Sequence, residues 1–392
     1  MRILYIHAHP LHNEMANAVQ VISMCKEFSK NHDVFLLSPS RGKSENEINS
    51  ILKQRFNLPN SIKLLFFNDV VSSRRISELI TYFSVNTFIK KVKPDFCFVR
   101  NSSFLRGCIR SKTPTFYEVH NNILHHRWKA FDFFLRKMLI LSSKSPHLIK
   151  FITISNSLKD YWISQDVPKT KTLVLHSGFS ALEFENPHSK LKARIITKLP
   201  DKAKIALYTG SLSADRKIEN ILFLAKQNID VLFVIIGGSE KQNYYYKNLS
   251  TKQDLYNIKF LGHIPHNIIP NYLFSADILL ALWSPMVPTI NFCSPLKVFE
   301  YMAAGRLILA HGFPTIKEVL MDSVNAYIAN PFDLDDLNKK FKQALNDQNA
   351  SKISDTARKD AFEKYSWSVR TDNIINEHKK YNMLKLNFNA KD

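Results

Sequence analysis

Residues 294–305 read SPLKVFEYMAAG, and they predict a capped helix that leads into a buried strand. Ser294 is a good N-cap, and Pro295 suits the first helical position because the N–H it lacks would be unpaired there. Gly305 supplies the stop, and residues 307–310 (LILA) have the composition of a strand. The free N–H groups and the positive dipole at the start of such a helix favour binding of a phosphate.

The same helix predicts two charged side chains near that phosphate position. Leu296, Phe299 and Ala303 follow helical spacing and are expected to form the buried face. Lys297 and Glu300 fall together off that face. We therefore expect the helix to present a cation and, in its second turn, a carboxylate.

The composition indicates a protein of two domains. At 392 residues, with 45% apolar and 12% aromatic residues, the chain can bury two cores. The four cysteines show no CxxC pair and no metal-like spacing, which fits a reducing compartment. Residues 1–6 (MRILYI) predict a first strand rather than a signal peptide, and no stretch reaches the ~18 apolar residues of a membrane span. We therefore expect a cytoplasmic protein.

The positive charge is concentrated in one quarter of the chain. The formal net charge is +20, and residues 51–150 hold 18 Lys/Arg against 5 Asp/Glu, so that +13 lies there. This concentration predicts a surface for an anionic partner such as a membrane, although ordinary solvated faces would give the same count. The chain lacks any helix-turn-helix, RRM or KH signature, so no nucleic-acid partner is expected.

Within this basic region, residues 124–139 (LHHRWKAFDFFLRKML) interleave aromatic and basic side chains. Such a pattern fits a membrane surface, where Trp and Phe enter the interface while Lys and Arg meet anionic headgroups. This interpretation predicts peripheral association with the inner face of the cytoplasmic membrane. A core helix with a basic outer face is the alternative.

Short apolar segments alternate with helical segments through both halves of the chain. This alternation predicts an α/β fold with two doubly wound parallel sheets, each covered by helices on both faces. The expected strands are 3–6, 33–37, 96–99, 115–120, 151–155, 205–208, 231–236, 258–261, 278–282 and 307–310. The expected helices include 13–29, 76–92, 132–141, 156–163, 218–227 and 295–304. The polar and then basic stretch 188–200 is expected to be a linker.

Several motifs of the second half, taken in order, resemble the retaining glycosyltransferases of the GT-B fold, in the group called family 4 or group 1. Besides residues 294–305, the matching segments are 208–212 (YTGSL), 216–217 (RK), 233–238 (FVIIGG), 258–265 (IKFLGHIP), 275–280 (SADILL) and 314–320 (PTIKEVL). In the first half, residues 118–120 (EVH), 151–157 (FITISNS) and 173–178 (LVLHSG) are similar to segments of the same family.

The resemblance implies a GT-B architecture, in which two Rossmann-like domains face a central cleft. It implies an N-terminal acceptor-side domain at 1–187, a linker at 188–200, a C-terminal sugar-nucleotide-binding domain at 201–365, and a C-terminal helix at 366–392 that returns to the first domain. The implied reaction moves a sugar, with retention, from a UDP- or GDP-sugar to a cell-envelope glycan or lipid-linked acceptor. The family needs no metal and no further cofactor for this reaction.

The resemblance also assigns catalytic roles to three residues. Glu300 matches the carboxylate that hydrogen-bonds the nucleotide ribose, and Arg216 falls where the family has the lysine that binds the donor diphosphate. His120 matches the histidine that approaches the transferred sugar from the N-terminal domain. From the residues alone, Glu300 could instead be an exposed glutamate paired with Lys297. Arg216 could be a solvated loop charge, and His120 a structural histidine.

Further donor contacts are expected at the strand ends and at the start of the helix. The expected donor-binding residues are Gly210, Arg216, Gly237, Gly238, Ile264, Ser294, Pro295, Leu296, Lys297 and Glu300. The backbone amides of residues 293–296 would surround the diphosphate. The two glycines after a strand would let the backbone approach a nucleobase, or would serve only a tight turn.

Two positions depart from the family pattern. The first carboxylate of the family's E-x7-E element would fall at Phe292, and the arginine that normally follows the glycine is Ser211. A non-catalytic sugar-nucleotide-binding partner of a glycosyltransferase is therefore an alternative. A sugar-nucleotide epimerase and a nucleic-acid-binding protein are further alternatives, but the sequence shows no acid/base carboxylates for the first and only charge for the second.

No metal site is expected. His7, His9 and His12 form a histidine-rich loop, but no carboxylate accompanies them at a metal-binding spacing. Asp333 and Asp335 resemble a DxD metal motif, but their place at a helix start predicts a cap.

Overall fold

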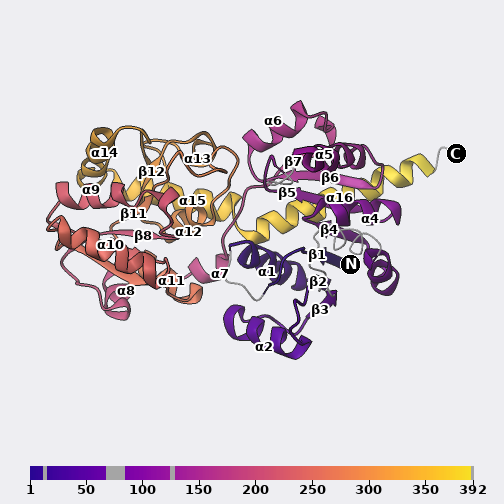
Figure 1. Cartoon of the computed structure of the whole chain (residues 1–392), viewed down its shortest axis with the longest axis horizontal. Helices are drawn as coiled ribbons and strands as arrows, with labels where there is room; N and C mark the ends of the chain where they lie inside the picture. The colour runs from indigo at the N-terminus through magenta and orange to yellow at the C-terminus, as the bar shows by residue number, and fades with distance from the viewer. Residues whose placement is uncertain (12–15, 68–83, 124–128, 390–392) are drawn as a thin grey trace. The chain divides into compact units, whose positions relative to one another are not determined.

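The apolar segments of the chain form two parallel β-sheets in the computed structural model, which describes residues 1–11, 16–67, 84–123 and 129–389. All ten expected strands are present, and three further short strands extend the sheets (Figure 1). Each sheet is parallel throughout, which agrees with the predicted α/β class.

The chain divides into two compact units. The first unit contains residues 1–176 and 367–392, and the second unit contains residues 177–366. The C-terminal helix therefore belongs to the first unit, although it follows the second unit in sequence.

The sheet of the first unit has seven strands in the order β3-β2-β1-β4-β5-β6-β7. The strands are β1 (Arg2–Ile6), β2 (Asp33–Pro39), β3 (Ile62–Phe67), β4 (Phe96–Val99), β5 (Thr115–Val119), β6 (Leu148–Thr153) and β7 (Thr172–Val174). The central strands β4 and β5 are buried along their whole length, as expected for a parallel sheet covered on both faces.

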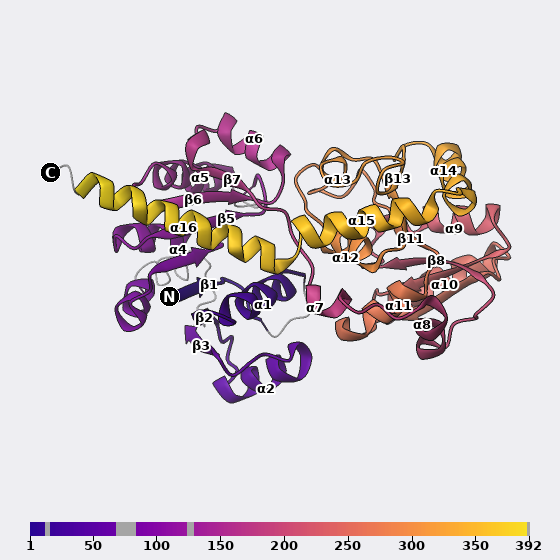
Figure 2. The same cartoon turned by 180° about the vertical axis from the view of Figure 1, so that it is seen from behind.

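Helices cover both faces of this sheet. They are α1 (Ala16–Ser29), α2 (Glu45–Phe56), α4 (Ser102–Arg110), α5 (Lys129–Ser143), α6 (Asn156–Ser164) and α16 (Trp367–Asn389). Helix α5 lies over the face seen in Figure 1, whereas α16 packs beside α1 on the face seen in Figure 2. Of the expected helix 76–92, residues 84–92 are helical, and residues 76–83 lie outside the described residues.

The sheet of the second unit has six strands in the order β10-β9-β8-β11-β12-β13. The strands are β8 (Lys204–Thr209), β9 (Val231–Ile236), β10 (Ile258–Gly262), β11 (Ile278–Ala281), β12 (Leu307–His311) and β13 (Tyr327–Ala329). Alternate residues of β8 enter two separate cores: Ile205 and Leu207 face one, while Ala206 and Tyr208 face the other.

Two groups of helices complete these cores. Helices α8 (Lys190–Thr197), α11 (Ile269–Ser275), α12 (Leu296–Ala304) and α15 (Ala350–Lys364) pack on one face, and α9 (Glu219–Gln227), α10 (Glu240–Lys252) and α14 (Leu334–Asn346) pack on the other. The short helices α7 (Ala181–Phe184) and α13 (Pro314–Lys317) also belong to this unit. Among the described residues, no helix combines the length and apolar composition needed to cross a membrane.

The stretch expected as a linker, residues 188–200, contains helix α8 and packs into the second unit. Arg194 explains this packing, because its buried guanidinium donates to the Ser275 carbonyl at 3.0 Å and pairs with Asp277 at 2.8 Å. The chain instead passes from the first unit to the second between residues 176 and 177. The polar composition of residues 188–200 therefore belongs to the outer face of α8, whose inner face packs against the core.

The strand ends of the second unit are packed tightly around Gly237. Its φ is +116°, and a Cβ there would lie 2.1 Å from the Gly210 carbonyl oxygen. Gly262 has a φ of +74°, but a Cβ added to it would have no atom within 4 Å. We expect Gly237→Ala to lower the free energy of unfolding by about 3 kcal/mol or more, because backbone strain and a backbone clash combine.

Gly262→Ala is the matched control, because it carries the backbone strain alone and should cost about 1–2 kcal/mol. Urea unfolding of both variants measures the difference. Equal losses for the two variants would contradict the packing argument.

Candidate functional site

Helix α12 begins at the carboxyl edge of the second sheet. Pro295 is its N-cap and Leu296 its first residue, so the prediction that Ser294 would cap the helix is wrong. The Ser294 hydroxyl instead accepts a hydrogen bond from the Ser177 backbone N–H at 2.9 Å. Gly305 ends the helix in the left-handed conformation, as predicted.

Lys297 extends from the first turn of α12 toward the end of β8. Its Nζ lies 3.3 Å from the Thr209 carbonyl oxygen and over the rings of Tyr208 and Trp283, at 4.0 and 4.7 Å from their centroids. Burial, together with the charge of Arg216, holds the pKa of Lys297 well below its ordinary value. The lowered pKa means that the protein disfavours the ammonium form. The aromatic faces and the carbonyl offset this effect in part, and a bound anion would stabilise the ammonium form further.

Arg216 ends a short 3-10 helix (Ala214–Arg216) in the loop after β8. Among the described residues of this unit, no carboxylate forms an ion pair with Arg216 or with Lys297. Two neighbouring cations without a counter-charge form a site to which an anion would bind favourably.

Three strand ends meet beside these cations. The Gly210 N–H donates to the Ile236 carbonyl at 3.0 Å, and the Gly237 N–H donates to the Gly262 carbonyl at 2.7 Å. A Cβ at Gly238 would lie 2.6 Å from the Leu212 side chain. The glycines at 210, 237 and 238 therefore have a packing role that the sequence left open.

The carboxylate of Glu300 is largely buried and is held by a histidine. Its side chain is 11% exposed, and its Oε1 lies 2.8 Å from His266 Nε2. The alternative of an exposed glutamate paired with Lys297 is therefore wrong. Burial lowers the pKa of His266, but the Glu300 charge and hydrogen bond outweigh burial and raise it to about 9. Ile264, in the same loop, packs against the core.

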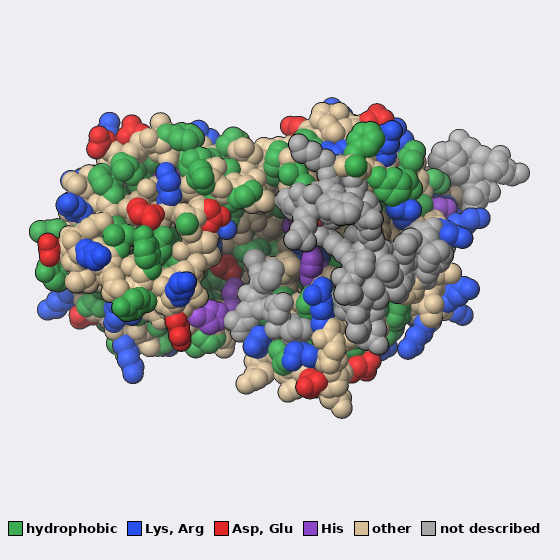
Figure 3. All heavy atoms as spheres, viewed as in Figure 1, with side chains coloured by type: hydrophobic (Ala, Val, Ile, Leu, Met, Phe, Trp, Pro, Cys, Tyr) green, Lys and Arg blue, Asp and Glu red, His purple; other side chains and the backbone are tan. Residues whose placement is uncertain are grey.

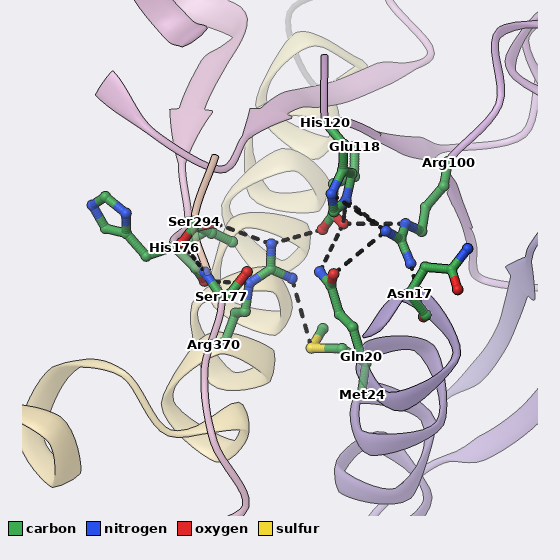
Figure 4. A network of polar contacts seen from close by, with 11 residues as sticks. Asn17, Gln20, Met24, Arg100, Glu118, His120, His176, Ser177, Ser294 and Arg370 are labelled. Atoms are coloured by element: carbon green, nitrogen blue, oxygen red, sulfur yellow. Dashed lines mark hydrogen bonds and ion pairs between the residues drawn. The ribbon is translucent and has the colours of Figure 1, made fainter. Parts of the chain in front are cut away.

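The first unit has a second polar cluster, at the carboxyl edge of its own sheet (Figure 4). Glu118 of β5 is fully buried and pairs with Arg370 of α16 at 2.7 Å and with Arg100 at 3.3 Å. Gln20 of α1 donates to the same carboxylate at 3.0 Å. Burial would raise the pKa of Glu118, but Arg370, His120 and Arg100 outweigh burial and hold it well below its ordinary value.

His120 lies at the outer side of this cluster. Its Nε2 contacts Oε1 of Glu118 directly, and Arg100 Nη2 lies 2.8 Å from the same nitrogen. Burial and the positive charge of Arg100 lower the pKa of His120 to about 4, so the imidazole is neutral at neutral pH. Its side chain is 31% exposed and accessible to a ligand.

Only part of the histidine-rich loop belongs to the described residues. His7 is buried and its ring lies 5.5 Å from that of His9, while His12 lies outside the described residues. In the described ranges, no three His, Cys, Asp or Glu side chains are grouped so that they could hold a metal ion. Asp333 caps α14 by accepting from the N–H groups of Asp335 and Asp336, as predicted.

With this geometry established, comparison with known proteins identifies the second unit. Residues 189–360 match the family model described as Glycosyl transferases group 1. These residues form a group 1 glycosyl transferase domain.

Two curated relatives share part of this chain. The lipopolysaccharide 1,2-N-acetylglucosaminetransferase of Salmonella typhimurium is 27% identical over 232 residues, which cover 56% of this chain and 58% of the relative. An uncharacterized glycosyltransferase of Methanocaldococcus jannaschii is 25% identical over 239 residues, which cover 58% and 59%. The chain thus matches somewhat more than half the length of each.

A solved structure resembles the whole chain. The Anabaena protein HepE, in complex with UDP, superposes with a TM-score of 0.75 at 16% identity and covers 97% of this chain and 100% of its own. This likeness confirms the predicted GT-B fold class.

Within the glycosyl transferase domain, the structure adds residues that the sequence analysis did not single out. Trp283 follows strand β11, and His311 ends the adjacent strand β12. His311 Nδ1 donates to the Trp283 carbonyl at 2.6 Å. Burial lowers the pKa of His311 to about 4, so this ring is neutral. An aromatic residue directly after an apolar strand was the available signal for Trp283, whereas nothing local marked His266 as the partner of Glu300.

The His266–Glu300 pair predicts a pH-dependent stability of the glycosyl transferase domain. A histidine whose folded-state pKa of about 9 exceeds its ordinary 6.5 stabilises the fold fully below pH 6.5, and this contribution is lost as the pH rises through 9. We expect wild type to unfold a few degrees above His266→Gln at pH 6, on the order of 1 kcal/mol for a partly exposed pair.

Thermal unfolding of both proteins between pH 6 and pH 10 measures this difference. The gap between wild type and His266→Gln should shrink as the pH approaches 9. A gap that stays constant over this range would contradict the ionic contribution.

Proposed function

We propose that this protein is a glycosyltransferase that moves a sugar from a nucleotide-diphosphate sugar to a cell-envelope glycan or lipid-linked acceptor, with retention. The observation that carries this proposal is the pair of cations, Lys297 and Arg216, at the carboxyl edge of a group 1 glycosyl transferase domain. Ligands of parallel α/β sheets bind at this edge. A diphosphate supplies the negative charge that these two side chains lack.

The chemistry follows from where charge develops. As the bond between sugar and diphosphate breaks, negative charge grows on the diphosphate, and two preorganised cations stabilise it. The N–H groups at the start of α12 add partial positive charge. Glu300 accepts from the ribose hydroxyls. The role of His120 toward the transferred sugar stays a prediction from the family resemblance. No covalent nucleophile and no metal ion are part of this proposal.

The relatives support the proposed substrates. The Salmonella relative is named a lipopolysaccharide N-acetylglucosaminetransferase, and HepE was solved with UDP and with UDP-glucose. We therefore propose a UDP- or GDP-sugar as donor and place the acceptor with the first unit. A cytoplasmic location agrees with the four free cysteines.

A non-catalytic sugar-nucleotide-binding partner is the second candidate, and two residues favour it. Ser211 and Phe292 replace charged residues of the family pattern. Ser211 is exposed, and its hydroxyl hydrogen-bonds that of Ser213 at 3.0 Å. The domain would then bind a donor without cleaving it.

We also propose that helix α5 of the first unit rests on an anionic membrane surface. Phe133, Phe134 and Leu141 are 50–64% exposed, and with Lys137 they form one stripe at helical spacing. Lys137 Nζ lies 4.7 Å from the centre of the Phe133 ring. Figure 3 shows hydrophobic side chains gathered over α5 with basic side chains beside them.

The opposite face of α5 is fixed to the first unit. Leu135 and Leu139 are buried, and Arg136 lies 5.5 Å from the centre of the Trp162 ring of α6. Because these contacts hold the opposite face, the exposed stripe keeps one orientation, and its side chains do not pack into the core. Residues 124–128, the first part of the predicted membrane segment, lie outside the described residues.

The donor prediction is tested by incubating the full chain with UDP- and GDP-sugars, with and without membrane lipid extract. We expect a glycosylated product in the presence of EDTA. We expect Lys297→Met to lower kcat by about 100-fold, because one of two cations at the leaving group is lost. Glu300→Gln should weaken donor binding and product formation, whereas Glu240→Gln, at an exposed position of α10, should change neither.

Three results would redirect the proposal. Tight sugar-nucleotide binding without transfer or hydrolysis would favour the non-catalytic partner. A requirement for added metal would contradict the metal-independent reaction. Salt-sensitive binding to random oligonucleotides, without nucleotide-sugar binding, would refute both candidates.

The membrane proposal is tested by sedimentation with vesicles of phosphatidylglycerol and of phosphatidylcholine. We expect the protein to sediment with the anionic vesicles, and the double variant Phe133→Ser/Phe134→Ser to lose binding by on the order of tenfold. Ile229→Ser is the control, because Ile229 is 81% exposed in the second unit. Equal sedimentation of the double variant and wild type would refute a role for α5.

A further inference from the structure

The two oxygens of the Glu300 carboxylate have different surroundings. Oε1 lies 2.8 Å from His266 Nε2. Among the described residues, Oε2 has no hydrogen-bond partner, yet it is not one of the sealed, unpartnered polar atoms, so solvent reaches it. A carboxylate that is only 11% exposed thus keeps one acceptor oxygen accessible to a ligand.

His266 has a carboxylate on each side of its ring. It begins a 3-10 turn (His266–Ile268) after β10, and its Nδ1 lies 3.9 Å from a carboxylate oxygen of Glu183 on α7. Glu300 and Glu183 are the charged groups that face its ring. Between two carboxylates the ring is protonated at neutral pH, so that Nε2 carries a hydrogen to donate to Glu300.

This arrangement removes a freedom that glutamate normally has. The last torsion of a glutamate side chain is broad, so an unrestrained carboxylate turns between many orientations. A hydrogen bond to one oxygen fixes the plane of the group and therefore the direction of the other oxygen. Two adjacent ribose hydroxyls need an acceptor in a fixed position, and preorganisation reduces the free-energy cost of binding them.

We propose that His266 is a positioning residue for the ribose of the donor nucleotide: it holds Oε1 of Glu300 so that Oε2 faces the ribose diol. This inference rests on the proposed nucleotide-sugar site. His266 acts through Glu300, and the Glu183 carboxylate adds an electrostatic attraction on the far side of the His266 ring. The proposal predicts that His266 determines discrimination between nucleotides with and without ribose hydroxyls.

The experiment compares two kinds of ligand on the full chain. UDP, GDP and their 2′,3′-dideoxy analogues are titrated calorimetrically into wild type and His266→Ala. We expect His266→Ala to weaken binding of the preferred ribonucleotide about tenfold, the usual effect of losing a hydrogen bond to a charged group. Binding of the dideoxy analogue should stay within about twofold of wild type, because it has no diol for Glu300 to bind.

Two variants separate positioning from a general structural role. His266→Gln keeps an amide N–H donor and should recover most of the discrimination. His188→Ala is the control, because His188 lies with Lys204 and Leu307 at the amino-terminal edge of the same sheet. A thermal unfolding measurement on each variant shows which proteins are folded at the titration temperature.

The outcomes separate the two proposals. If wild type binds neither UDP nor GDP, the proposed function itself fails. If wild type binds one of them and folded His266→Ala or His266→Gln loses ribonucleotide and dideoxy analogue equally, the positioning role is refuted while the nucleotide site stands. Unchanged discrimination in every His266 variant would refute it as well.

Discussion

The placement of the Lys297 ammonium group is the constraint on which the candidate site depends. A cation withdrawn from water is unstable unless other groups replace its hydration. The rings of Tyr208 and Trp283 and the carbonyl of Thr209 do so in part. Gly210 favours this arrangement, because a Cβ there would lie 3.2 Å from the Tyr208 hydroxyl and 3.5 Å from Lys297 Nζ, and its φ of +143° suits glycine.

The central charged clusters of the two units differ in how their charge is compensated. In the first unit, Glu118 is surrounded by Arg100, Arg370 and His120, so its charge is compensated within the protein. Arg370 belongs to α16, and the pair therefore anchors this helix to the first sheet. Removal of Glu118 would leave the buried Arg370 guanidinium without its carboxylate partner. In the second unit, Lys297 and Arg216 form no ion pair with a carboxylate of the described residues, which is the condition expected of a protein that binds an anionic ligand.

Local pattern accounts for much of what could be predicted. Helix α12 ends at Gly305, as capping rules indicate, but Glu300, predicted to lie off the buried face, is itself buried. Ser294 departs from those rules because the backbone of Ser177, more than a hundred positions earlier in the chain, uses its hydroxyl. Residues 188–200 have a linker-like composition, but Arg194 buries its charged end against Asp277 and makes α8 part of a core.

The sequence by itself determined the α/β class and all ten expected strands, because strand periodicity and turn residues are properties of neighbouring positions. The candidate donor-site segments came from the resemblance to the glycosyltransferase family. The tertiary structure alone decided which groups surround each charged side chain: His266 contacts Glu300, Arg370 contacts Glu118, and Lys297 contacts two aromatic rings. These partners lie on different strands and helices, and electrostatic pairing depends on distance in space rather than on separation along the chain.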